Sequence, residues 1–263
     1  MIPRLVILGF AAVLTIVEVI KPLRARQHEP KSRRARRNLA VAGLAATAVQ
    51  LIEQPVVMPL ARLAEHRRWG LVHALGLPPW LATMVALVAL DYTLYLWHVL
   101  VHRSPVLWRF HAVHHADLDL DASTAVRFHF GELALSVPWR AAQIALIGVG
   151  PRTLALWQSA TLLSVLFHHS NIRLPRAAER LLGYFLVTPS MHGIHHSMDD
   201  ADMNANWSSG LSVWDRMHGT LRTDVPQDQI RIGVAGHDDP HDVTLPDILV
   251  EPFRSSRSDD LAS

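Results

Sequence analysis

The chain has 263 residues, of which 50% are hydrophobic and 18% are charged, a charged fraction that is low for a soluble protein. It contains no cysteine, which excludes disulfide bonds and metal sites built on thiolates. The formal net charge of +2 gives no overall bias toward nucleic acid, so we expect no nucleic-acid partner.

The apolar residues gather in five segments, at 5–20, 39–61, 81–97, 133–149 and 153–167. A helix that crosses the hydrocarbon core of a bilayer needs roughly 20 residues, which the first three segments approach. The last two are shorter, and the Gly148-Val-Gly-Pro151 turn between them predicts a hairpin. We therefore predict an all-α integral membrane protein with about four to five transmembrane or hairpin helices. The first segment has no sizeable basic stretch before it, so we expect a retained helix rather than a signal peptide.

Basic residues predict the orientation in the membrane. Residues 21–38 contain eight Lys or Arg, whereas residues 62–79 contain three. Loops rich in Lys and Arg face the cytoplasm, so the third segment should end on the cytoplasmic side, at His98. The alternative interpretation of the basic run is a nucleic-acid patch, but its position between two apolar segments favours a juxtamembrane loop. The Ala-, Arg- and Leu-rich composition favours a bacterial inner membrane.

Three histidine clusters follow the third segment, and the predicted hairpin returns the last of them to the same face. They read His98-Val-Leu-Val-His102, His111-Ala-Val-His-His115 and His192-Gly-Ile-His-His196. Residues three or four apart share one face of a helix, so each cluster can direct two or three imidazoles at one point. Eight neutral imidazoles suit two metal ions better than one. We therefore predict a histidine-rich helical cap on the cytoplasmic side.

Several alternatives remain open at this level. Imidazole suits zinc, copper, iron and nickel, and spacing does not choose among them. A non-catalytic zinc-binding membrane protein or a haem-binding electron carrier would also use histidines. Asp91 lies on one stripe with Tyr95, His98 and His102, where it either orients an imidazole or packs against Tyr95 or the backbone. Asp215 either orients an imidazole or has an ordinary role in a turn.

The sequence around the clusters resembles that of the fatty acid hydroxylase or sterol desaturase superfamily of integral membrane di-iron oxygenases. The resemblance runs from about Asp91 to Arg254. It rests on the three histidine clusters and on four further motifs: Arg127-Phe-His-Phe-Gly-Glu132, Phe167-His-His-Ser-Asn-Ile-Arg-Leu-Pro175, Thr188-Pro-Ser-Met191 and Trp214-Asp-Arg-Met-His-Gly-Thr220. The chain departs from the family pattern at Asn206-Trp-Ser208 and at Met217-His218, beside the third cluster.

The resemblance implies a metal-ligand set of nine histidines: His98, His102, His111, His114, His115, His169, His192, His195 and His196. His168 and His129 are further candidates, with Glu132 one turn after His129, and Asp91 and Asp215 are candidates for orienting the ligands. It also implies two irons, with zinc possible in the isolated protein, and O2 as co-substrate. The partners would be a lipid or sterol from the bilayer and a separate ferredoxin- or cytochrome-like electron donor.

The implied reaction is hydroxylation, desaturation or cleavage of a lipid or sterol. The expected organisation has three parts: an N-terminal transmembrane hairpin over residues 1–80, a catalytic domain over 81–225, and a polar cytoplasmic tail over 226–263.

Overall fold

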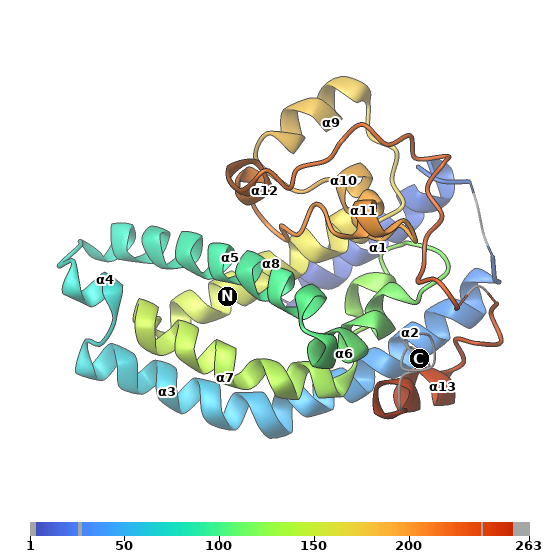
Figure 1. The fold of residues 1–263 in the computed structure, drawn as a ribbon. Helices are drawn as coiled ribbons and strands as arrows, with labels where there is room; N and C mark the ends of the chain where they lie inside the picture. Colours follow the sequence, from blue (N-terminus) through green and yellow to red (C-terminus); the bar gives the residue numbers. More distant parts are fainter. Residues whose placement is uncertain (1–3, 26–27, 238, 255–263) are drawn as a thin grey trace, which may run out of the picture.

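The computed structural model describes residues 4–25, 28–237 and 239–254, and all of its regular elements are helices (Figure 1). The long helices are α1 (Arg4–Ile20), α2 (Lys31–Ala48), α3 (Gln54–Arg67), α5 (Pro79–Arg103), α7 (Phe130–Ile147) and α8 (Pro151–His169). The shorter helices are α4 (Leu71–Ala74), α6 (Pro105–His115), α9 (Arg176–Gly183), α10 (Pro189–His195), α11 (Asp200–Met203), α12 (Val213–His218) and α13 (Leu245–Val250). Within the described ranges, extended backbone pairs only at three isolated bridges, such as Ser197 with Ile232.

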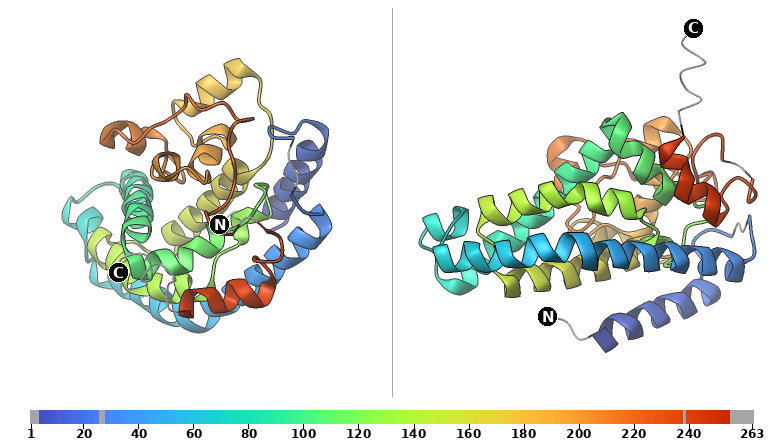
Figure 2. Two further views of the ribbon diagram at one scale, coloured as in Figure 1. Left: turned by 45° about the vertical axis from the view of Figure 1, so that its right-hand side comes forward. Right: turned by 90° about the horizontal axis from the view of Figure 1, so that it is seen from below.

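The long helices form a bundle whose two ends differ (Figures 1 and 2). At one end lie α4, the start of α5 and the turn between α7 and α8. At the other end lie α6, α10 and α11, together with the last turns of α5 and α8. Helix α1 packs against α8 along the side of the bundle. The chain therefore brings residues from α5, α6, α8 and α10 together at one end, although these helices are far apart in sequence.

Helices α2 and α3 form one continuous rod that runs along the bundle (Figure 2). A π-helical turn, Val49–Glu53, joins them. Pro55 follows this turn, lacks an amide hydrogen and would clash with the carbonyl of residue 51 in an α-helical register. The wider π turn relieves that conflict without ending the helix.

Two glycines close the other end of the bundle. Gly70 and Gly148 have φ angles of 87° and 86°, in the left-handed region that favours glycine. A Cβ atom on Gly70 would lie 2.3 Å from the Gly148 amide nitrogen. Only glycine at both positions allows the turn before α4 to contact the turn between α7 and α8.

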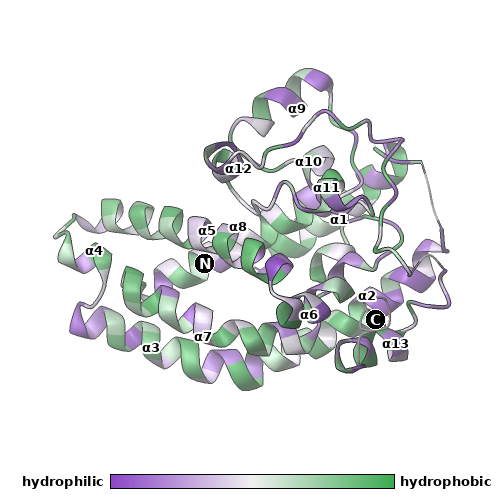
Figure 3. Cartoon of the chain, viewed as in Figure 1, coloured by the Kyte–Doolittle hydropathy of each residue, from purple (hydrophilic) through white to green (hydrophobic). Residues whose placement is uncertain are grey.

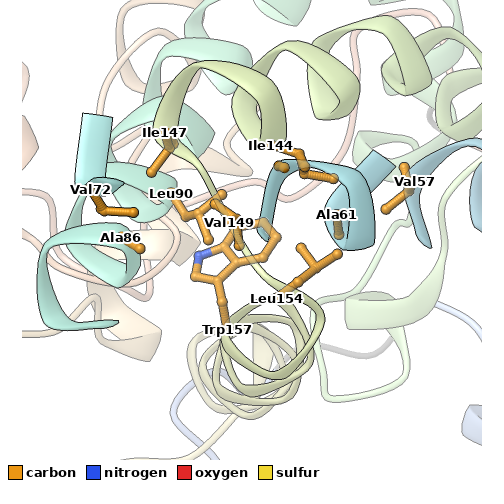
Figure 4. Packing of buried hydrophobic residues seen from close by; sticks show 11 residues of the cluster. Val57, Ala61, Val72, Ala86, Leu90, Ile144, Ile147, Val149, Leu154 and Trp157 are labelled. Atoms are coloured by element: carbon orange, nitrogen blue, oxygen red, sulfur yellow. The ribbon is translucent and has the colours of Figure 1, made fainter. Parts of the chain in front are cut away.

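The main hydrophobic core lies between α3, α5, α7 and α8 (Figure 4). Val57, Leu90, Ile144 and Leu154 are each fully buried there, and Trp157 lies beside them. Helices α5 and α7 are rich in hydrophobic residues, whereas α9 on the cap is more polar (Figure 3). Several of these hydrophobic side chains are exposed, such as Met84 on α5 and Leu146 on α7. An apolar outer surface on a bundle of long helices is typical of a protein that contacts lipid.

The all-helical prediction is confirmed, and the described residues contain two helical stretches long and apolar enough to cross a membrane, Lys31–Ala74 and Pro79–Arg103. The predicted hairpin at 133–167 is present as α7 and α8, but neither helix meets the same criterion of length and hydropathy. Residues 255–263 of the expected tail lie outside the described residues.

Candidate metal centre

Nine histidines converge at the cap end of the bundle, and they are the nine implied by the resemblance. His98 and His102 lie on α5. His111, His114 and His115 lie on α6, which Pro105 begins and the Ser104 hydroxyl caps by accepting the Leu107 amide hydrogen. His169 ends α8, and the third cluster lies at the end of α10, with His196 directly after the last helical residue. The structure thus unites side chains that are up to 98 residues apart in sequence, as in the case of His98 and His196.

The nine imidazoles form two groups. Group one contains His98, His102, His111, His115 and His195, and group two contains His114, His169, His192 and His196. Within each group, one ring nitrogen per residue lies within 4.8 Å of all the others. All nine side chains are buried except His102, which is partly buried. The groups adjoin, because the His115 and His196 rings stack with centroids 4.3 Å apart.

Hydrogen bonds fix the tautomers of three imidazoles in group one. His98 donates its Nδ1 hydrogen to the Trp207 carbonyl at 2.7 Å. His111 donates to the Glu132 carboxylate at 3.0 Å, and His195 donates to the Ala205 carbonyl at 2.9 Å. In a neutral imidazole with the hydrogen on Nδ1, Nε2 carries only a lone pair. All three residues therefore present bare Nε2 lone pairs.

Those lone pairs face one another. The Nε2 atom of His98 lies 3.2 Å from that of His111 and 3.1 Å from that of His195. Two acceptors at this distance cannot hydrogen-bond each other, and they repel unless a cation lies between them. Nitrogen ligands with their second nitrogen bonded to oxygen are the usual ligands of protein-bound transition metals. The donor set of group one therefore fits a metal ion.

Group two has similar Nε2 geometry with fewer supporting contacts. His169 donates its Nδ1 hydrogen to the Val165 carbonyl at 2.8 Å, so its Nε2 is also bare. That Nε2 lies 2.9 Å from His114 Nε2 and 3.0 Å from His192 Nε2. The Nδ1 atoms of His114, His192 and His196 are buried and have no hydrogen-bond partner in the described part of the chain.

Burial favours the neutral imidazole at His114, His115, His192 and His195. It lowers the pKa of His195 to about 3. Burial, and then the neighbouring imidazoles, hold the pKa of His114, His115 and His192 well below the ordinary value. A metal ion binds the neutral imidazole, so this environment favours the form that binds metal.

Buried ion pairs position the end of α6. Arg34 on α2 bonds to Asp117, with Nη1 and Oδ2 3.0 Å apart, and also pairs with Asp121. Arg37 pairs with Glu29 at 2.7 Å. Asp117 follows His115 by two residues, and its pKa is lowered by the Arg34 and Arg127 guanidinium groups in spite of burial. The start of α2 is thereby tied to the loop that follows the second cluster.

The carboxylates expected to orient imidazoles have other contacts. Asp91 accepts hydrogen bonds from the Leu211 amide and from Trp214 Nε1, so of the alternatives left open it is the contact with a backbone group that is found. Its side chain projects toward Gly210, where a Cβ atom would lie 2.0 Å from Asp91 Oδ1, and this contact directs it away from the histidines.

Asp215 accepts from the amides of Trp207 and Ser208 and from the Thr220 hydroxyl. It therefore reaches His98 only through the Trp207 carbonyl. The residue that does contact an imidazole is Glu132, within the motif that begins at Arg127. The sequence places Glu132 one turn after His129, but it does not show that the Glu132 side chain points toward His111.

His129 and His168 lie outside both groups. His129 caps α7, because its Nδ1 accepts the Gly131 amide hydrogen and its Nε2 donates to the Leu249 carbonyl. Both ring nitrogens of His129 are therefore used in these hydrogen bonds, and neither is free to bind a metal. His168 lies beside group two, with its ring centroid 4.0 Å from that of His192.

Comparison with known proteins identifies the family to which the chain is similar. The profile of the family described as fatty acid hydroxylase matches residues 83–220, slightly more than half of the chain. Ornithine lipid hydroxylase OlsE of Rhizobium tropici is 30% identical over 58% of this chain and 45% of its own length. Alkylglycerol monooxygenase of Xenopus tropicalis is 26% identical over 58% of this chain and 34% of its own length. Cholesterol 25-hydroxylase of Mus musculus is 27% identical over 53% of this chain and 46% of its own length.

The matched region thus spans less than half the length of each of these relatives, and no solved structure matches the chain. The family match begins on α5, ends at Thr220 and encloses every histidine of the two groups. The chain belongs to the fatty acid hydroxylase family.

Proposed function

We propose that this protein is a membrane-bound, O2-dependent oxygenase that holds two metal ions and oxidises a C–H bond of a lipid or sterol. The observation that carries the proposal is the set of bare Nε2 lone pairs that face one another at 3.1–3.2 Å around His98. Group one and group two would each hold one ion. A pair of iron ions, when bound, would supply O2 activation and C–H oxidation. Electrons would come from a separate donor protein.

A cavity beside the histidines supports a lipid or sterol substrate. Its volume is about 610 Å³, within the range of roughly 300–1,000 Å³ that is typical of small-ligand pockets. It lies between α2, α5, α7 and α8, and His98, His111, His114 and His169 reach it. Its walls are mostly apolar, with Ala45, Leu94 and Leu162 among them. The protein's part in the reaction would be to hold an apolar chain beside the metal ions and to exclude water.

The positions of the helix ends support a cytoplasmic site. Lys31, Arg33, Arg34, Arg36 and Arg37 begin α2 at the histidine end of the bundle, and Arg34 is bonded to the loop that follows His115. The other end carries the few basic residues around Arg67. By the positive-inside rule, this distribution supports a cytoplasmic location for the histidine end. In this topology α7 and α8 form the hairpin that enters from the histidine end and returns to it.

The metal content of the full chain tests the proposal. The protein would be purified anaerobically in detergent, and iron and zinc would both be quantified. Two irons per chain, with O2 uptake in the presence of a reductase and lipid, would support an oxygenase. Tight zinc with no O2 uptake after iron reconstitution would favour a non-catalytic zinc protein, and a Soret band would favour haem. Absence of any bound metal in folded protein would contradict the proposal.

A further inference from the structure

Besides the histidines, the polar residues that line the cavity include Arg140 of α7, Gln158 of α8 and Gln50, and the first two form a second polar end. Arg140 is eight residues after Glu132, which bonds to His111, so it lies about 12 Å further along the bundle at 1.5 Å per residue. Gln158 is eleven residues before His169, or about 16 Å by the same measure. The helices run antiparallel, which brings Arg140 and Gln158 to the same level.

Arg140 has few partners for a charged group between membrane helices. Its Nη1 donates to Gln143 Oε1 at 3.1 Å, and its guanidinium lies 4.6 Å above the Trp157 ring. Its Nε atom is fully buried and has no hydrogen-bond partner in the described ranges. An unpaired donor in an apolar environment is costly, and ionisable residues at this depth usually serve a ligand or a transport path.

One carboxylate, that of Glu53, already lies near Arg140. Glu53, at the end of the π-helical turn, is buried and interacts electrostatically with Arg140, although the described residues show no ion pair between them. A second carboxylate would compete with Glu53 for the single positive charge. A neutral oxygen would instead accept a hydrogen bond from Arg140, and the Gln158 side chain can accept from a hydroxyl.

We propose that this polar end binds a neutral oxygen, a hydroxyl or a carbonyl, on the substrate, so that oxidation occurs at the opposite end of an apolar chain. The proposal deepens the function inferred above, because it uses the same cavity. Arg140 would then be a specificity-determining residue, because its position sets the distance between the polar group of the substrate and the carbon that is oxidised. The substrate class is an amphiphile with its polar group held about 12–16 Å from the metal centre along the helices.

Photolabelling of the metal-loaded full chain tests this orientation without turnover. The probe is a dodecanol that carries a diazirine beside its methyl end, and labelled positions are mapped by mass spectrometry. We expect label near the histidines, at Phe128 or Val101. Unlabelled dodecanol should compete about tenfold better than dodecane, the effect of one hydrogen bond to a charged group. Dodecanoic acid should compete less well than dodecanol.

The variant Arg140→Met should label both ends of the cavity and lose the preference for dodecanol. Arg152→Met, which changes an exposed arginine at the start of α8, should behave like the wild type. If Arg140→Met does not fold, Gln158→Leu removes the neutral partner and should reduce the same preference. Label at Trp157 or Gln158 in the wild type, an unchanged map in Arg140→Met, or stronger competition by dodecanoic acid would overturn the proposal. Metal content measured on the same samples reports separately on the proposed function.

Discussion

In group one, His98, His111 and His195 each donate an Nδ1 hydrogen to a protein oxygen. In group two, only His169 does so among the described residues, and the Nδ1 atoms of His114, His192 and His196 are buried without a partner. Acceptors behind a ligand fix the direction of the ring and raise its affinity for metal. Hydrogen bonds therefore orient three of the five rings of group one before a metal binds, but only one of the four rings of group two. We expect group one to hold its ion more tightly.

The largest expected effect is the loss of one ligand from either group. His195→Ala should remove the metal ion of group one, and His114→Ala should remove that of group two, because each substitution deletes one ligand from its group. Either loss should abolish turnover, since the reaction needs both ions. Metal analysis and O2 uptake measure both. His66→Ala, which changes an exposed histidine at the far end of α3, is the control. Full metal content and activity in either group variant would contradict the assignment of its group.

Acid tests a property that the two groups share. The pKa of His195 in group one is lowered to about 3, and that of His192 in group two is also lowered, both by burial. In the unfolded chain a histidine has a pKa of about 6.5. Below that pH the unfolded state therefore binds protons that the folded state does not. Each such histidine should cost up to about 1.4 kcal/mol of stability per pH unit as the pH falls below about 6.

The metal-free protein should therefore melt at a progressively lower temperature between pH 7.5 and pH 5. The melting temperature in detergent, measured at several pH values, checks this expectation. A constant melting temperature over that range would show that the buried imidazoles are already protonated or are exposed in the metal-free fold. Since both groups contribute, the pH profile should not separate them, and only metal affinity should do so.

The carboxylate behind His111 gives the sharpest distinction between the groups. Glu132→Leu removes the acceptor that orients His111, and such changes typically cost 10–100-fold in metal affinity. Chelator competition should show this loss for the group one ion, with the group two ion unchanged. Glu132→Gln keeps an oxygen acceptor and should lose less. Equal weakening of both ions would mean that the groups act as one site.

The sequence predicted which residues meet but not how they are oriented. The histidine spacing and the family resemblance led to the nine residues that the structure brings together, because helical periodicity fixes which side chains share a face. The acceptors behind those rings are mostly backbone carbonyls, at Trp207, Ala205 and Val165, and a residue type carries no information about where its carbonyl points.

Asp91 shows the same limit for a side chain. Its place on the stripe with His98 left contact with an imidazole, with Tyr95 or with the backbone open, and the side chain turns toward Gly210 and bonds to the Leu211 amide and Trp214. Tertiary contacts with a loop 120 residues away in sequence decided its direction. In the same way, the five apolar segments predicted a helical bundle, but not the continuous rod of α2 and α3, which depends on a π-helical turn before Pro55.

The smallest expected effect on metal affinity comes from Asp215, which acts on group one through one intermediate. Its carboxylate accepts hydrogen bonds from the Trp207 and Ser208 amides, and the Trp207 carbonyl accepts one from His98. Asp215→Asn keeps one oxygen acceptor, so one of the two amides should lose its partner. Removing an acceptor from a buried amide costs about 1–3 kcal/mol of folding stability. The Trp207 carbonyl would still be present but less well fixed.

We therefore expect a lower melting temperature together with a loss of group one affinity smaller than that in Glu132→Leu, measured by the same chelator competition. Thr220→Val removes the hydroxyl that bonds to Asp215 and Tyr95 but leaves the Trp207 amide bonded to Asp215, so it is the matched control for an effect on stability alone. If Asp215→Asn and Thr220→Val lower stability equally and leave metal affinity unchanged, Asp215 serves the fold alone. If metal affinity falls in Asp215→Asn but not in Thr220→Val, the loop that carries Trp207 helps to orient the His98 ring before the metal binds.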